Sequence, residues 1–240
     1  MKAYAAIPAA MAVVVVLGGP AARAQSEPEA GWSPSTRAGD WREEVARFEV
    51  GYRGVFVTNA GYNPFSTDDY FSGASLTLSR TVYTHGRFAF APGVSWDYGA
   101  AEATARGDST SLKVNRLTVP LEGRVHLGPF GYVFVRVAPG IAGERSEVDD
   151  PSAPSALTKS IWLFTTDASA GYAVPVLPLP EHPGRAVRIW LQGDAGYSWV
   201  VDNRLALTPT SNDGQTAAAV DLGSLGLRGA FLRFALAVSY

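Results

Sequence analysis

The sequence predicts an all-β fold, namely an eight-stranded antiparallel up-and-down transmembrane β-barrel. Apolar and polar residues alternate along eight separate segments, which is the period of a β-strand. The connections between these segments are alternately long and short, as in barrels with long loops at one end and short turns at the other. After the N-terminal segment, the chain has no further apolar run long enough to form a membrane-spanning helix.

The composition narrows the class of protein. The chain has 240 residues, which fits a single barrel domain, and a formal net charge of -2. Nucleic-acid binding needs a clustered basic surface, which this sequence lacks, so no nucleic-acid partner is expected. The absence of cysteine excludes a disulfide framework, a cysteine-based metal site and a lipidated N-terminal cysteine. We expect neither a metal nor a cofactor.

Residues 1–24 are predicted to be a cleaved signal peptide. Lys2 supplies the positive charge, residues 9–17 form the apolar core, and Ala22-Arg23-Ala24 places the cleavage site just after Ala24. A transmembrane anchor is the alternative interpretation. The apolar core is shorter than the ~20 residues that a helix needs to span a bilayer, so a signal peptide is favoured.

Residues 25–43 are predicted to be a flexible periplasmic segment, because they are rich in Ser, Pro, Glu and Gly. Trp32 and Trp41 are its only large apolar residues. The barrel is expected to follow over residues 44–240.

The first four strands are predicted at residues 44–57, 70–83, 88–98 and 112–127. In each, an apolar face alternates with a face of small, polar or charged residues. The apolar faces are Phe48, Val50, Tyr52 and Phe56; Ala74, Leu76, Leu78 and Val82; Phe88, Phe90, Val94, Trp96 and Tyr98; and Leu117, Val119, Leu121, Val125 and Leu127. Pro92 has no N–H group, so a β-bulge is expected in the third strand.

The last four strands are predicted at residues 132–142, 159–174, 185–201 and 225–240. Their apolar faces are Val133, Val135, Val137 and Ile141; Trp162, Phe164, Ala168, Ala170 and Tyr172; Val187, Ile189, Leu191, Ala195, Tyr197 and Trp199; and Leu232, Phe234, Leu236, Val238 and Tyr240. An even number of strands returns both ends of the barrel chain to the same side of the membrane.

Long loops are predicted at residues 59–69, 99–111, 143–158 and 202–224, because these stretches are polar and contain Gly, Pro, Asn and Asp. The connections 84–87, 128–131 and 175–184 are shorter. The second long loop contains Arg106-Gly107-Asp108, which is similar to an integrin-binding tripeptide. So short a motif recurs by chance, and a solvated loop is the better interpretation.

The polar faces of the strands are expected to line the barrel interior. The charged residues predicted there are Arg47, Glu49, Arg53, Glu122, Arg124, Arg136, Asp167, Arg188, Asp194 and Arg233. A soluble eight-stranded barrel of the lipocalin type is the alternative fold, but its ligand cavity would favour an apolar lining. Because an eight-stranded barrel leaves room only for side chains, these charges are expected to pair and fill the lumen.

Aromatic residues gather near the strand ends, as expected at the two membrane interfaces. The predicted aromatic girdle consists of Trp96, Tyr98, Trp162, Tyr197 and Trp199 toward the loops, and of Tyr172, with Phe88 and Tyr240, toward the turns.

The closing strand ends on an aromatic residue, Tyr240, after the alternating apolar row Leu232, Phe234, Leu236 and Val238. In this feature and in its strand pattern, the chain resembles the small eight-stranded outer-membrane barrels of the OmpA, OmpX and OmpW type. The resemblance implies a location in the outer membrane of a Gram-negative bacterium, surrounded by outer-membrane lipids. It also implies that the barrel-assembly machinery reads the terminal row as an assembly signal.

The first and last strands must pair, because an open sheet edge is not tolerated in lipid. This pairing is expected to bring Arg233 near Glu49.

Enzymatic activity is not predicted. His85, His126 and His182 fall at or near the short turns. Barrel enzymes of similar size, the lipid A deacylase and palmitoyltransferase, use a His–Ser pair or triad at the external leaflet. A catalytic pair of that kind cannot be assembled here, so we assign no catalytic residues.

The predicted function is a structural or surface-interaction role for a barrel whose lumen is filled by charged side chains. A narrow, porin-like channel for small solutes or ions is the alternative, and a lipid-modifying enzyme is the least favoured. The long loops could contact an extracellular partner, which the sequence does not identify.

Overall fold

The computed structural model describes residues 45–105, 107–149, 156–178, 187–209 and 220–240. The predicted signal peptide, the segment 25–43, Arg106 and His182 lie outside these ranges. None of the helices in the described ranges is long and apolar enough to cross a membrane.

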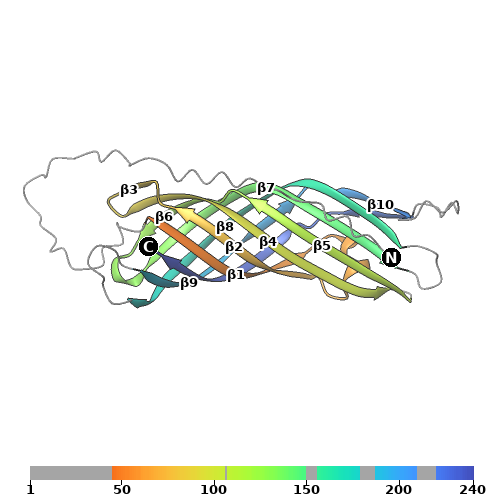
Figure 1. The fold of residues 1–240 in the computed structure, drawn as a ribbon, viewed down its shortest axis with the longest axis horizontal. Helices are drawn as coiled ribbons and strands as arrows, with labels where there is room; N and C mark the ends of the chain where they lie inside the picture. The colour runs from red at the N-terminus through yellow and green to blue at the C-terminus, as the bar shows by residue number, and fades with distance from the viewer. Residues whose placement is uncertain (1–44, 106, 150–155, 179–186, 210–219) are drawn as a thin grey trace, which may run out of the picture. The chain divides into compact units, whose positions relative to one another are not determined.

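Eight antiparallel strands form a closed hydrogen-bonded ring (Figure 1). In ring order they are β1 (Ala46–Val57), β2 (Tyr70–Arg80), β4 (Phe88–Ala105), β5 (Asp108–Thr118) continued by β6 (Leu121–His126), β7 (Tyr132–Asp149), β8 (Leu157–Pro178), β9 (Arg188–Val200) and β12 (Gly229–Ser239). β12 pairs with β1 from Arg47↔Ser239 to Val57↔Gly229, so the first and last strands close the barrel. The predicted eight-stranded antiparallel barrel is confirmed.

The irregularity predicted at Pro92 lies in the neighbouring chain and not in β4 itself. β4 keeps one register across this residue, with Phe88 opposite Val125 and Trp96 opposite Leu117. On its other side, β4 changes partner next to Pro92, from β2 to the short strand β3 (Tyr83–His85). Across this step the neighbouring chain has one residue more than β4, since Ser79 lies opposite Gly93 whereas Tyr83 lies opposite Phe90. The missing N–H group of Pro92 therefore falls where the ladder is interrupted.

One end of the barrel carries longer hairpins than predicted. β4 and β5 run through most of the predicted loop 99–111, and β7 and β8 extend into the predicted loop 143–158. The predicted loop 202–224 contains β10 (Asn203–Pro209) and β11 (Val220–Leu225). We call this end the hairpin end (Figure 1). The opposite end, with Gly86, the 3-10 turn η3 (Gly128–Phe130) and Tyr240, is the turn end.

These extensions carry inward apolar residues. Ala101 of β4, Val148 of β7 and Leu157 of β8 are partly buried and pack against a buried apolar cluster. The first long connection, predicted as a loop at 59–69, contains the 3-10 helix η2 (Ala60–Phe65), whose Tyr62 and Phe65 are also buried. These stretches were predicted as loops because they are polar and contain Gly, Pro, Asn and Asp.

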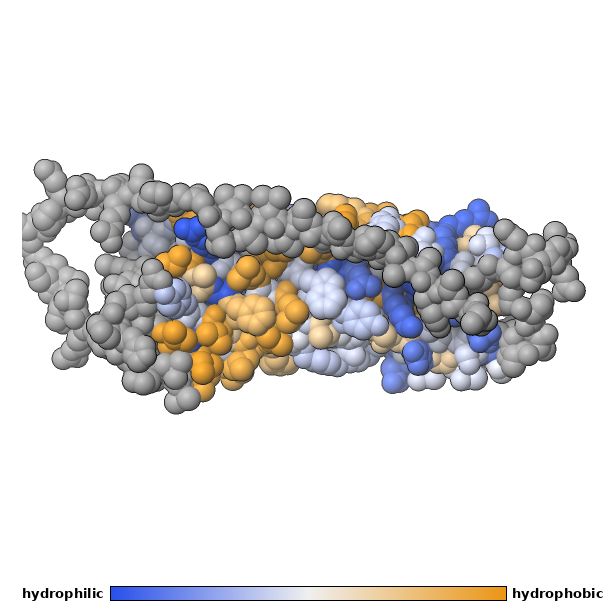
Figure 2. Space-filling model, viewed as in Figure 1, coloured by the Kyte–Doolittle hydropathy of each residue, from blue (hydrophilic) through white to orange (hydrophobic). Residues whose placement is uncertain are grey.

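The wall of the barrel reverses its polarity from one end to the other. In the turn-end half of β7, the outward residues are Val133, Val135, Val137 and Ile141. Beyond Ile141, the outward residues include Arg145 and Glu147. Figure 2 shows the same change, with hydrophobic residues gathered over one half of the visible face and hydrophilic residues toward the hairpin end. Only the turn-end half therefore has the surface that lipid requires.

Candidate functional site

The candidate functional site is the charged interior of the barrel. Nine of the ten charged residues predicted there are buried, each with at most 8% of its surface exposed. Arg188 is the exception, since it is only partly buried near the turn end. These residues point inward because they occupy alternate positions on strands whose other face is apolar.

A network of five charges fills the turn-end half of the interior. Glu122 accepts hydrogen bonds from Arg124 Nε at 2.6 Å and from Arg136 Nε at 2.7 Å. Arg136 Nη2 also lies 3.3 Å from Glu49, which in turn lies 3.1 Å from Arg47 Nε. Charges this deeply buried are tolerated only when they are paired in this way.

Aromatic rings close the interior at the turn end. The guanidinium of Arg47 lies 5.3 Å from the ring centre of Tyr132 and 5.4 Å from that of Trp190. The guanidinium of Arg124 lies 5.0 Å from the same ring centre of Tyr132. Tyr132 and Trp190 pack with Phe134 in one buried cluster. Cation–π contacts of this kind are stronger when water is excluded.

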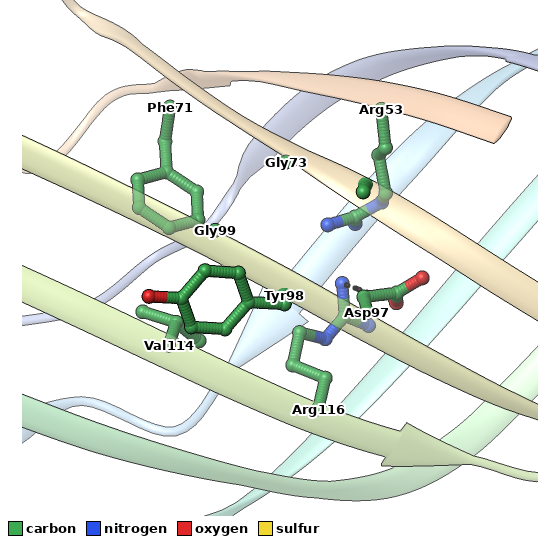
Figure 3. A pocket seen from close by; sticks show the side chains of 9 residues that line it. Arg53, Phe71, Gly73, Asp97, Tyr98, Gly99, Val114 and Arg116 are labelled. Atoms are coloured by element: carbon green, nitrogen blue, oxygen red, sulfur yellow. Dashed lines mark ion pairs between the residues drawn. The ribbon is translucent and has the colours of Figure 1, made fainter.

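A second group of charges occupies the middle of the interior (Figure 3). Asp167 lies 3.1 Å from Arg53 and 2.8 Å from Arg116, and Arg116 lies 3.8 Å from Asp97. A cavity of about 10 Å³ borders Arg53, Asp97 and Arg116. It has room for about one water molecule.

The expected contact between Arg233 and Glu49 is wrong. Arg233 lies opposite Arg53 on β1 and opposite Asp194 on β9. Its guanidinium donates two hydrogen bonds to the Asp194 carboxylate, at 2.8 and 2.7 Å. Pairing of the first and last strands did not fix their register, and the observed register places Glu49 opposite Ala237.

An apolar cap covers the charged interior at the hairpin end. It is a cluster of inward aliphatic and aromatic residues, consisting of Val55, Val57, Tyr62, Phe65, Phe71, Leu112, Val114, Ala142, Val200, Leu205, Leu207, Leu225, Leu227 and Phe231. The helix η2 folds into this cluster, where Tyr62 donates a hydrogen bond to Tyr70 O at 3.0 Å and Thr110 donates one to Pro64 O. The cap and the charged groups together leave the described interior packed with side chains.

Sequence reasoning left several of these residues out. Asp97 and Arg116 lie on the polar faces predicted for their strands, but they were not included among the predicted lumen charges. Tyr132 and Trp190 were missed because aromatic residues were expected mainly at the outer surface. Four residues of the apolar cap, Tyr62, Phe65, Leu205 and Leu207, come from stretches predicted as loops. Its other residues were missed because they lie on strand faces that were expected to be polar.

Glu144 is a buried carboxyl group at the edge of the cap. It is 3% exposed, and neither oxygen has a hydrogen-bond partner among the described residues. Its cross-strand neighbours are Val114 and Ile161. It lies past Ile141, the last large apolar residue on the outward face of β7, and so outside the membrane-spanning part. Burial raises the pKa of Glu144 from 4.5 to about 7, and the nearby Lys159 opposes this rise only partly.

This pKa predicts that the barrel loses stability as the pH rises from about 4.5 to about 7. The native state holds the proton more tightly than the unfolded chain, so the stabilisation is complete below the unfolded pKa and is lost above the folded one. The loss is on the order of 3 kcal/mol. Urea unfolding of the protein in lipid at several pH values measures it. Glu144→Gln should remove this pH dependence, whereas the exposed Glu102→Gln should retain it. An unchanged pH profile in Glu144→Gln contradicts the prediction.

The predicted aromatic girdle faces outward. Trp96, Tyr98, Trp162, Tyr172, Tyr197 and Trp199 are all exposed on the outer wall. Trp96 stacks on Tyr98 with ring centres 6.4 Å apart, and Trp199 meets Phe164 edge-on at 6.1 Å. The predicted terminal row also faces outward, since Leu232, Phe234, Leu236, Val238 and Tyr240 are all exposed.

The described histidines lie at the turn end. His85 is exposed in β3, and His126 is buried beside Tyr132, with ring centres 5.2 Å apart. No cluster of three or more His, Asp or Glu residues that could hold a metal ion is found in the described ranges.

The fold and its interior define a class of protein. A closed barrel with a charged, packed interior and an apolar outer band is a transmembrane β-barrel, because only lipid favours such an outer surface.

No protein-family model and no curated protein matches the chain. Several solved structures have a similar arrangement of strands. Ail of Yersinia pestis is 12% identical with a TM-score of 0.43, over 82% of this chain and 98% of that chain. Neisserial surface protein A is 11% identical with a TM-score of 0.38, over 81% and 96%. The outer-membrane protease OmpT of Escherichia coli is 7% identical with a TM-score of 0.41, over 85% and 99%. The barrel assignment for this chain follows from its own strand pairings.

Proposed function

We propose that the protein is an integral barrel of a bacterial outer membrane that does not conduct solutes and has a structural or surface-interaction role. The observation that carries this proposal is the packed interior. The ion-paired charges occupy the turn-end half and the middle, and the apolar cap covers them at the hairpin end. A solute would have to displace both groups of side chains to pass.

The hairpin end is the part available to a partner. The extended hairpins β4–β5, β7–β8 and β10–β11 reach beyond the apolar band, and their outward residues include Lys113, Arg145 and Arg204. In the proposed orientation, the hairpin end projects outside the cell and the turn end faces the periplasm. This orientation agrees with barrels that have short periplasmic turns and longer external loops.

Three features of the proposal concern biogenesis. Residues 1–24 would direct export and be removed after Ala24, and residues 25–43 would remain as a periplasmic segment before the barrel. The terminal row from Leu232 to Tyr240 would be recognised by the barrel-assembly machinery. Its outward orientation leaves it accessible to a partner before the barrel is surrounded by lipid.

An enzymatic role is not proposed. The charged groups around Glu122 and around Asp167 are held in ion pairs rather than presented to a substrate. The described histidines lie at the turn end, away from the exposed hairpins. Turnover of lipid A by the purified protein above background would overturn this part of the proposal.

The purified protein is expected to show no steady conductance in planar bilayers, because its interior is packed. A large open porin inserted into the same bilayer serves as the positive control. A steady conductance that disappears when Arg124 or Arg136 is neutralised would overturn the closed barrel and favour the channel. Membrane insertion is checked separately by heat-modifiable migration on detergent gels. A mature protein that is soluble without detergent would contradict the membrane location.

A further inference from the structure

Two basic side chains stand next to each other on the outer wall, near the hairpin end. Lys113 of β5 and Arg145 of β7 are direct partners across the antiparallel pair. Both point outward and are exposed, and the Arg145 side chain is 61% exposed. Their neighbours on the adjoining strands are Ala100 and Ser160, which are small and uncharged. The two positive groups therefore face outward without a bulky neighbour between them and the surroundings.

The pair lies one row beyond the aromatic girdle. The next row toward the turn end contains Asn115, which is opposite Tyr98 on one side and Gly143 on the other. The ring of Trp162 lies against Gly143. One row corresponds to about 7 Å along a strand. Because aromatic girdles mark the membrane interface, Lys113 and Arg145 lie at the level of the lipid headgroups.

The protein neutralises this pair only in part. Like charges directly opposite each other on neighbouring strands destabilise a sheet. In the described part of the chain, Lys113 forms no ion pair, and the ion pair of Arg145 is with Glu147, at 3.4 Å on the exposed surface. Exposed pairs of this kind are weak. An anion bound between the two basic groups would remove their repulsion.

The surrounding charges indicate from which side that anion comes. The next row away from the membrane contains Ser111, which lies opposite Glu102 on β4 and Glu147 on β7. A soluble anion that approached from solvent would meet these two carboxylates first. An anion that approached from the membrane would meet only the aromatic row. The arrangement therefore favours an anion that is attached to a lipid.

We propose that Lys113 and Arg145 bind the phosphate group of a lipid in the outer leaflet. The ammonium group of Lys113 and the planar guanidinium of Arg145 offer charge-assisted hydrogen bonds to phosphate oxygens. The girdle residue Trp162 lies one row nearer the membrane, where the upper part of the lipid would pass. The inference rests on the proposed membrane location.

The test measures binding of lipid A to the full-length protein in non-ionic detergent micelles, with dephosphorylated lipid A and inorganic phosphate as the comparison ligands. Lys113→Gln together with Arg145→Gln is expected to weaken lipid A binding roughly tenfold or more, because each basic residue near an anionic surface contributes substantially. Glu147→Gln should strengthen it. Arg80→Gln together with Arg87→Gln, two exposed basic residues at the turn end, is the matched control and should bind as the wild type does.

Equal binding of lipid A by the Lys113/Arg145 double variant overturns the proposal, and so does equal binding of dephosphorylated lipid A by the wild type. Inorganic phosphate that binds as tightly as lipid A would indicate a site for free anions and would also overturn it. Heat-modifiable migration is scored first for every variant. If the wild type itself fails to insert, the membrane proposal fails, whereas insertion with unaltered lipid A binding overturns only the lipid site.

Discussion

Glu122→Ala is expected to lower the free energy of unfolding of the barrel by about 3–5 kcal/mol. Glu122 is buried and accepts hydrogen bonds from both Arg124 and Arg136. Its removal leaves the two buried guanidinium groups without the carboxylate that helps to balance their charge. Removing one partner of a buried ion pair is strongly destabilising. Urea unfolding of the protein in lipid vesicles, followed by tryptophan fluorescence, measures the change.

The matched control is Asp221→Ala at the hairpin end. Asp221 pairs with Arg204 at 2.6 Å, but both side chains are exposed to solvent. Its replacement should change the free energy of unfolding far less, because water solvates the arginine that remains. Equal effects of the two substitutions would show that the charges near Glu122 are hydrated, and would contradict the packed interior.

Phe65→Ala is expected to destabilise the protein by about 3–5 kcal/mol, the usual cost of removing a fully buried phenylalanine. Phe65 is 0% exposed and belongs to the apolar cap, which η2 enters from the connection between β1 and β2. The same unfolding measurement applies. Phe130, which is 72% exposed in η3, provides the control, and Phe130→Ala should cost much less.

Phe65→Ala also distinguishes the contribution of the apolar cap to closing the barrel from that of the charged groups. The charged groups below the cap remain in place in this variant, so it should still show no steady conductance. A variant that is destabilised and conducts would mean that the cap alone closes the barrel. A variant with wild-type stability would mean that η2 does not occupy the interior.

The membrane-spanning half of the protein could be predicted from its sequence. Alternation along β1, β7 and β12 identified the inward charges and the outward apolar rows, because neighbouring side chains of a strand point to opposite faces. The hairpin end could not be predicted as well. There most outward residues are polar, and apolar residues such as Leu205 and Leu207 face inward. Over short stretches rich in Gly, Ser and Asp this pattern resembles a loop.

The sequence also did not predict which residues are neighbours across adjoining strands. Arg233 was expected near Glu49, but it pairs with Asp194, because a sequence shows which face a residue occupies and not its register. Glu144 illustrates the same point. Its inward position follows from alternation. That it has no hydrogen-bond partner among the described residues depends on its cross-strand neighbours, Val114 and Ile161.

The sequence by itself determined the strand number, the antiparallel class and the separation of a charged face from an apolar face. These properties are local, since they depend on the alternation of residues along each strand. The tertiary structure alone decided which charges pair, that η2 folds into the lumen, and that Lys113 and Arg145 become neighbours. These properties depend on the register between strands and on side chains far apart in the chain, because closing the ring fixes all registers together.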